Sequence, residues 1–276
     1  MVWLPLALFA LVTWSIQRVV TKAALVRWST ARFYRWNAIV SLAVYFPFAV
    51  LVPPRADALA GALALSFLMA LTFWVTTEAT RRGPVSAVAP LTATSPALTV
   101  VLAVVLLSER PDALAIAGVV LAIAAALLLA LRPGPAPLGA WVALALASVA
   151  LQGIGAFVAK VVVTEGGPTT LLVTSVLVQL AVGAYIARAE PLDLGSQLRG
   201  MPLVVTVTLA AAALATVGYL TALSIGPASL VVPLVATSPA LGGLLGIVVL
   251  GERVSRRQAI GIALGLVAII LLARPP

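Results

Sequence analysis

Long apolar segments recur along the whole chain and constrain its fold more than any other feature. Each is about 20 residues long and nearly uncharged, and a helix of that length crosses the roughly 30 Å hydrocarbon core of a bilayer. Hydrophobic residues make up 63% of the 276 residues and charged residues only 9%, against about a quarter charged in soluble domains. We therefore predict an all-α integral membrane protein with ten transmembrane helices, near residues 4–24, 33–52, 59–80, 85–107, 113–131, 138–162, 169–189, 202–225, 228–250 and 257–273.

Other interpretations of these segments fit the sequence less well. Barrel strands would alternate apolar and polar residues with period two, whereas these segments are continuously apolar. The first segment has no basic start, is too long for a signal-peptide core and has no small-residue cleavage site before Arg18, so we expect it to be retained. The intervals between segments are too short to hold a soluble domain.

The residue types that are missing exclude several kinds of chemistry. The chain has no cysteine and no histidine, so it lacks disulfides, thiolate nucleophiles, imidazole bases and the usual ligands of zinc or haem. We expect no metal, no cofactor and no catalytic site. The net charge is +9, but the basic residues lie at segment ends rather than on a soluble face, which argues against binding of nucleic acid.

The basic residues also predict an orientation. Connections after the first, third, fifth, seventh and ninth segments share one side of the membrane, and most of the lysines and arginines lie there. The opposite side has only Arg55, Arg110, Lys160 and Arg274. The positive-inside rule then places the odd connections in the cytoplasm and both termini outside, in the inner (cytoplasmic) membrane.

A short proline-containing stretch occurs twice. PLTATSPAL begins at Pro90 and PLVATSPAL at Pro233, and other pairs, such as Gly118 with Gly261, repeat at the same spacing. Earlier in each half the spacing is slightly smaller, as for Lys22 and Lys160. These matches predict two homologous five-helix halves, residues 1–133 and 138–276. Because five is odd, the second half must be inverted in the membrane, an arrangement that recurs in secondary transporters.

These motifs resemble a known family. Each half has a Gly-Pro before its fourth segment, prolines within that segment, an LSERP or LGERV end (from Leu107 and Leu250) and glycine in the fifth segment. This pattern is similar to the EamA-type domains of the drug/metabolite transporter superfamily. The resemblance implies a carrier, and related carriers move amino acids, other metabolites, quaternary amines, nucleotide sugars or phosphorylated sugars. In that family both termini are usually cytoplasmic, the reverse of the orientation that the charges predict here.

Charged and aromatic residues in the first and third segments are candidates for substrate binding. One turn of the first segment has Trp14, Gln17 and Arg18, and one face of the third has Trp74, Thr77 and Glu78. Arg18 and Glu78 lie at similar depth, so they could pair or hold the two charges of a zwitterion. Alternatively, Arg18 reaches the headgroups beside Lys22, and Glu78 pairs with Arg81 or Arg82.

Polar residues in other segments complete the predicted substrate site. They are Asn37 and Tyr45 in the second segment, Thr94 and Ser95 in the fourth, Gln152 in the sixth, Tyr219 in the eighth, and Thr237 and Ser238 in the ninth. The competing interpretation is structural, because prolines bend helices and buried amides join neighbouring helices. Glu109-Arg110 and Glu252-Arg253 recur at the ends of the fourth and ninth segments, where we expect them to form the turn into the next helix.

The favoured function is a secondary-active or facilitative transporter that exports a small polar or amphipathic metabolite, such as an amino acid, by alternating access. The alternative is a transporter or flippase of a lipid or lipid-linked headgroup, with Arg18, Lys22 and Arg35 near the phosphate. No Gly-x-x-x-x-Gly-Lys-Ser/Thr motif is present for ATP. The expected partners are a small-molecule substrate and the lipid bilayer, and the protein is expected to be a monomer or homodimer.

Overall fold

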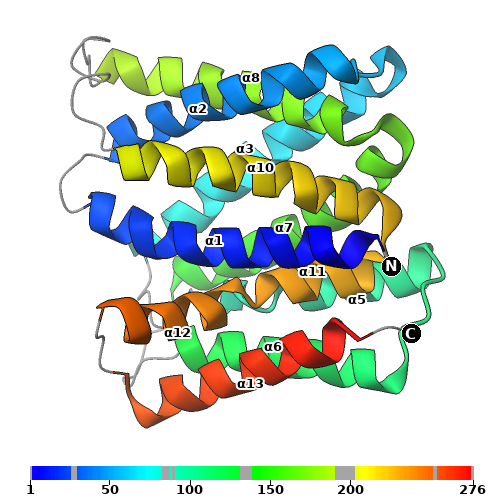
Figure 1. Cartoon of the computed structure of the whole chain (residues 1–276), viewed down its shortest axis with the longest axis vertical. Coiled ribbons are helices and arrows are strands. Elements are labelled where there is room, and N and C mark those ends of the chain that lie inside the picture. Colours follow the sequence, from blue (N-terminus) through cyan, green and yellow to red (C-terminus); the bar gives the residue numbers. More distant parts are fainter. Residues whose placement is uncertain are drawn as a thin grey trace.

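A computed structural model of the chain describes residues 2–25, 30–82, 88, 91–130, 139–189, 203–250 and 254–274. Within these ranges the side chains of some helical residues, Arg18 and Thr77 among them, lie outside the described part. All regular structure in the described residues is helical (Figure 1). The prediction of a multi-pass, all-helical membrane protein is confirmed.

The helices follow the predicted segments closely. The first half has α1 (Trp3–Leu25), α2 (Thr30–Leu51), the 3-10 turn η1 (Ala56–Ala58), α3 (Leu59–Arg82), α5 (Ser95–Leu106) and α6 (Ala113–Ala130). The second has α7 (Ala140–Gly166), α8 (Pro168–Ala189), α10 (Leu203–Ile225), α11 (Ala228–Ala236), α12 (Ser238–Leu250) and α13 (Arg256–Leu272). In the described residues six helical stretches are long and apolar enough to cross a membrane, and three shorter apolar ones overlap the predicted segments 4–24, 85–107 and 113–131.

Local sequence explains where several helices begin and end. Ser255 caps α13 in a reciprocal capping box with Gln258. The Asp112 side chain accepts a hydrogen bond from the amide of Ala115 at 2.7 Å and so caps α6. Helix α7 ends at Gly166, and the next residue is Gly167, whose φ of 78° lies in the left-handed region that glycine adopts without strain.

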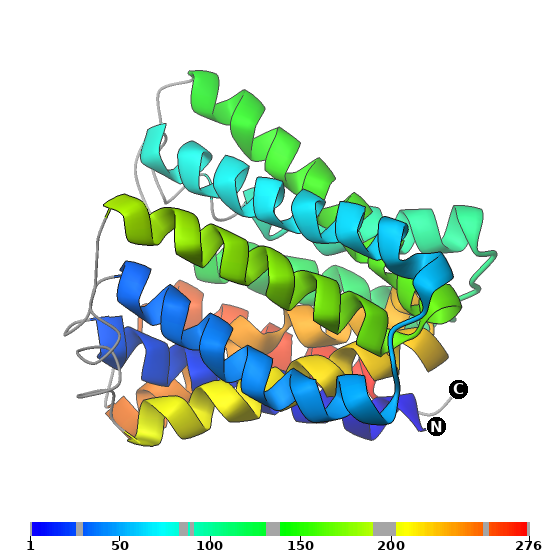
Figure 2. The same cartoon turned by 90° about the horizontal axis from the view of Figure 1, so that it is seen from above.

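The helices associate in pairs that join the two halves of the chain. Helix α1 packs along α10, and α3 packs along α7 (Figures 1 and 2). Helix α2 packs on α8, and α6 on α13. Glycine permits the last contact, because a Cβ at Gly118 would lie 2.9 Å from Leu272 Cγ and one at Gly261 would lie 3.2 Å from the Ala125 oxygen.

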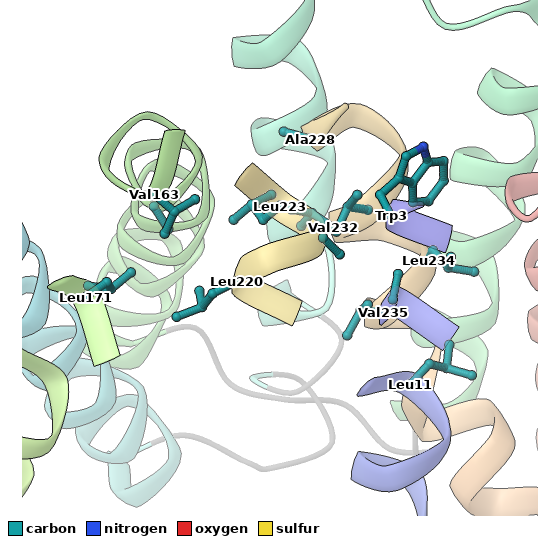
Figure 3. Packing of buried hydrophobic residues seen from close by; sticks show 14 of the residues in the cluster. Trp3, Leu11, Val163, Leu171, Leu220, Leu223, Ala228, Val232, Leu234 and Val235 are labelled. Carbon is teal, nitrogen blue, oxygen red and sulfur yellow. The ribbon is translucent and has the colours of Figure 1, made fainter. Parts of the chain in front are cut away.

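The largest buried cluster lies where α1, α7, α8, α10 and α11 meet. Figure 3 shows Val163 of α7 opposite Leu220 and Leu223 of α10, with Val232 of α11 and Trp3 of α1 beside them. Large apolar side chains also cover the outside of the bundle, as expected for helices whose solvent is lipid tails. Polar side chains buried between these helices are therefore the natural place to look for a functional site.

Candidate functional site

The doubled nonapeptide folds into the same turn twice. At Thr94 φ and ψ are −85° and −7°, and at Thr237 they are −77° and −3°. Each threonine hydroxyl donates to the carbonyl three residues earlier, at 2.7 Å for Thr94 to Leu91 and 2.5 Å for Thr237 to Leu234. The same two carbonyls also accept hydrogen bonds from the backbone amides of Thr94 and Thr237, so each threonine hydroxyl adds a second donor to the turn beside the prolines.

Four polar side chains from three helices form one connected group, which we call the Gln152 cluster: Thr76 of α3, Ser95 of α5, and Ser148 and Gln152 of α7. The Gln152 amide nitrogen donates to Ser148 Oγ at 2.9 Å and to Thr76 Oγ1 at 3.4 Å. Ser95 Oγ donates to Gln152 Oε1 at 3.4 Å, and the Thr76 and Ser148 hydroxyls are also hydrogen bonded. The structure therefore brings the predicted residues Ser95 and Gln152 together.

Two aromatic side chains meet between α1 and α10, and we call them the Trp14 pair. The rings of Trp14 and Tyr219 have centroids 5.3 Å apart and are tilted by 53°, a favourable arrangement for two aromatic rings. The indole nitrogen of Trp14 donates to the Ala212 oxygen at 3.3 Å. Both predicted residues thus lie together, with the indole oriented by the backbone of α10.

The Gln152 cluster and the Trp14 pair stand at matching positions of the sequence repeat. Trp14 is separated from Gln152 by the same spacing as the two repeated lysines, and Thr76 is separated from Tyr219 by the spacing of the nonapeptides. Their helices correspond as well, because α1 packs on α10 as α7 packs on α3. One position of the repeat therefore has a hydroxyl and amide network, and the matching one has aromatic rings.

Residues of the second predicted segment lie at the contact of α2 with α10. Tyr45 is 5% exposed, and its hydroxyl lies beside those of Ser41 and Thr216. Asn37 is half-buried on the same helix.

Ser238 of the ninth predicted segment is buried at the start of α12, and its carbonyl oxygen lies 3.1 Å from the hydroxyl of Ser15 on α1.

The charged pair expected at Arg18 and Glu78 stays a prediction, because the Arg18 side chain, like that of Thr77, lies outside the described part. Glu78 accepts a hydrogen bond from Arg82 Nε at 2.6 Å across one turn of α3. The competing interpretation of Glu78 included this pair. Trp74 is 61% exposed on α3, and Gln17 is half-buried on α1, so the described contacts do not bring these two together with Gln152 or Tyr219.

Sequence reasoning missed four polar residues of this region: Ser15, Thr76, Ser148 and Thr216. Ser148 lies one helical turn before Gln152 and therefore on the same face, a spacing that could have indicated it. Ser15 and Thr216 gave no such signal, because each has a polar contact with another helix that sequence spacing does not indicate. In the described residues no group of three or more Asp and Glu side chains could hold a metal ion.

Comparisons with known proteins agree with this architecture. A family model described as the EamA-like transporter family matches residues 1–131 and 139–274. One solved structure, described only as the crystal structure of a protein, superposes with a TM-score of 0.77 at 15% identity. That alignment covers 98% of this chain and 95% of the other, so the two share a fold. No curated protein matches the sequence significantly.

Proposed function

The chain belongs to the EamA-like transporter family, and we propose that it moves a small polar or amphipathic metabolite, such as an amino acid, by alternating access. The family makes it a membrane transporter and confirms the resemblance seen in the sequence. The moving parts in this proposal are two inverted five-helix halves, residues 1–133 and 138–276. Export is the proposed direction, with both termini on the extracytoplasmic side.

The pairing of the helices supports two halves related by a two-fold axis. Such an axis exchanges α1 with α7, α3 with α10, and α5 with α12. It therefore requires that the contact of α1 with α10 be repeated by α7 with α3, and that of α1 with α12 by α7 with α5. All four contacts are present. The matching turns at Thr94 and Thr237 add two equivalent breaks in the helices, which are natural places for a hinge.

The contrast between the Gln152 cluster and the Trp14 pair is the observation on which the substrate class depends. An amide and three hydroxyls supply both donors and acceptors for a polar group. The two rings supply an apolar surface and can also attract a cation. A substrate with two unlike ends, such as an amino acid, would satisfy both positions at once, whereas a uniformly polar or uniformly apolar one would satisfy only one.

The decisive experiment is counterflow in proteoliposomes against a panel of amino acids, amines and phosphorylated compounds. For the compound that is transported, we expect Gln152→Leu to reduce counterflow about tenfold or more, since a lost hydrogen bond in a buried site costs about 1–3 kcal/mol. The matched control is Thr208→Ala, because the Thr208 hydroxyl is exposed and donates only to its own helix at Val204, at 2.7 Å. Equal counterflow by the parent and Gln152→Leu would contradict the proposed site.

A second pair of variants distinguishes two roles of Glu78, which are binding of a cationic substrate group and pairing with Arg82. If its carboxylate binds a cationic group of the substrate, Glu78→Gln abolishes transport of amino acids and amines, while Arg82→Gln leaves transport active. If Glu78 serves only to hold Arg82, the two variants lose the same ion pair and behave alike. Loss of transport in Glu78→Gln alone, with normal folding, is the result that this proposal requires.

A further inference from the structure

The connection between α10 and α11 is held by a carboxylate from the other half of the chain. Glu109, which follows α5, accepts hydrogen bonds from the amides of Ala228 and Ser229, each at 2.8 Å, and from the Ser229 hydroxyl. These amides belong to the first turn of α11, where backbone donors have no helical partner and a negative charge is stabilised. The contact therefore joins two parts of the chain that are far apart in sequence.

The other end of the same connection is held by an ammonium group. Lys160 of α7 points its Nζ at the carbonyl oxygens of Leu223, Ser224 and Gly226, at 2.8, 3.3 and 2.9 Å. An ammonium has three N–H donors, and the end of a helix has unpaired carbonyls and a partial negative charge. Lys160 therefore caps the end of α10, while Glu109 caps the start of α11 and attracts the lysine across the turn.

The aromatic side chain of Trp3 also contacts this turn. A Cβ at Gly226 would lie 2.6 Å from Cγ of Trp3, so the indole at the start of α1 packs directly on this glycine. Both Trp3 and Glu109 belong to the first half, and the turn that they contact belongs to the second. Figure 1 places the turn at the end of the bundle where both termini lie.

A second link between the halves joins the connection after α2 to the connection between α7 and α8. Arg55, between α2 and η1, donates from Nη1 to the Glu165 oxygen at 2.8 Å and from its backbone amide to Thr170 Oγ1 at 3.0 Å. Its ion pair with Asp57 lowers the pKa of that carboxyl. Side chains just inside these connections are buried, since Val163 is 1% exposed and Leu223 is fully covered.

We propose that Glu109 and Lys160 form a clamp on the α10–α11 turn that keeps this end of the carrier closed, and that the clamp must release for substrate to pass there. The inference rests on alternating access. Opening this end separates the halves and therefore breaks the contact between Glu109 and α11, which leaves a carboxylate and backbone amides without their partners. By the sequence repeat, Glu252 corresponds to Glu109 and Lys22 to Lys160; Glu252 and the side chain of Lys22 lie outside the described part.

The test uses the absence of cysteine in the chain. Ala228→Cys places one thiol on the first turn of α11, at the contact with Glu109 of the other half, where Ala228 is fully buried (Figure 3). In lipid nanodiscs, where both faces are accessible, the rate of labelling by a membrane-impermeant maleimide reports how often this end opens. We expect Glu109→Gln to raise that rate about tenfold over the reporter alone, and Lys160→Met to raise it as well. Glu109→Asp, which keeps the charge, should restore much of the protection.

The matched control is Asp112→Asn. Asp112 lies with Glu109 in the connection between α5 and α6, but it caps α6 of its own half, so the variant loses a helix cap and keeps the contacts between the halves. Faster labelling in Glu109→Gln but not in Asp112→Asn supports the clamp. Equal labelling in the two, with a reporter that does label, overturns the clamp and leaves alternating access standing. A thiol that is protected in every variant, yet labels fully in denatured protein, overturns both the clamp and alternating access.

Discussion

The Gln152 cluster and the Trp14 pair occupy matching positions in the two halves, yet one is a hydrogen-bonded network and the other a contact of two rings. The helices around them correspond pair by pair, and so do the turns at Thr94 and Thr237. Positions that match in the sequence repeat and are packed by matching pairs of helices thus have side chains of different chemistry. This difference is the basis on which we propose a substrate with two unlike ends.

The largest effect is expected where Gly153 is replaced by the residue at the matching position of the other half. Its counterpart is Ser15, by the same spacing that relates Gln152 to Trp14. The Ser15 hydroxyl lies 2.6 Å from the Leu11 oxygen and 3.1 Å from the Ser238 oxygen. A Cβ at Gly153 would lie 2.7 Å from Leu98 Cβ and 2.9 Å from the Ser95 oxygen, which is backbone and cannot move aside.

We therefore expect Gly153→Ser to destabilise the protein by about 2 kcal/mol through overpacking between α5 and α7. Thermal unfolding of the purified protein in detergent, followed by tryptophan fluorescence, measures the loss. The reverse exchange, Ser15→Gly, is the control, because it removes a hydroxyl without a clash and should cost less. An unchanged unfolding midpoint in Gly153→Ser would mean that the two halves are interchangeable here.

The aromatic side of the comparison is tested by a double-mutant cycle. Trp14→Leu and Tyr219→Leu each lose apolar contacts with several neighbours. The contact between the two rings is the one interaction that both single variants remove, so the cycle isolates its free energy. For tilted rings at this distance we expect a coupling free energy of about 1 kcal/mol, measured from unfolding of both single variants and the double variant. Strictly additive losses would show that the rings are neighbours without a specific interaction.

The smallest effect is expected from Tyr219→Phe, which tests the hydroxyl of the Trp14 pair without changing how the rings pack. Tyr219→Phe removes one hydroxyl and keeps the ring, so it should leave the free energy of unfolding within about 0.5 kcal/mol of the parent. If the hydroxyl binds substrate, counterflow should still fall about threefold or more, as expected for one hydrogen bond. Unchanged counterflow would restrict the role of this position to its ring.

Much of the fold could be predicted because its signals are local. The long apolar segments predicted the helices, and the doubled PLTATSPAL-like stretch predicted two equivalent turns that the structure contains. The candidate site could be predicted less well. Gln152 and Ser95 were identified as polar residues in apolar segments, but the contact between them depends on how α5 approaches α7 at Gly153.

By itself the sequence determined that this chain crosses a membrane many times and contains a repeated motif, because hydrophobicity and duplication are written in consecutive residues. Only the tertiary structure decided which polar groups meet. Glu109 reaches the start of α11 from a distant part of the chain, and Thr76 meets Gln152 only because α3 packs along α7. In lipid these partners are set by close packing of helices and by buried hydrogen bonds, neither of which leaves a pattern in one segment alone.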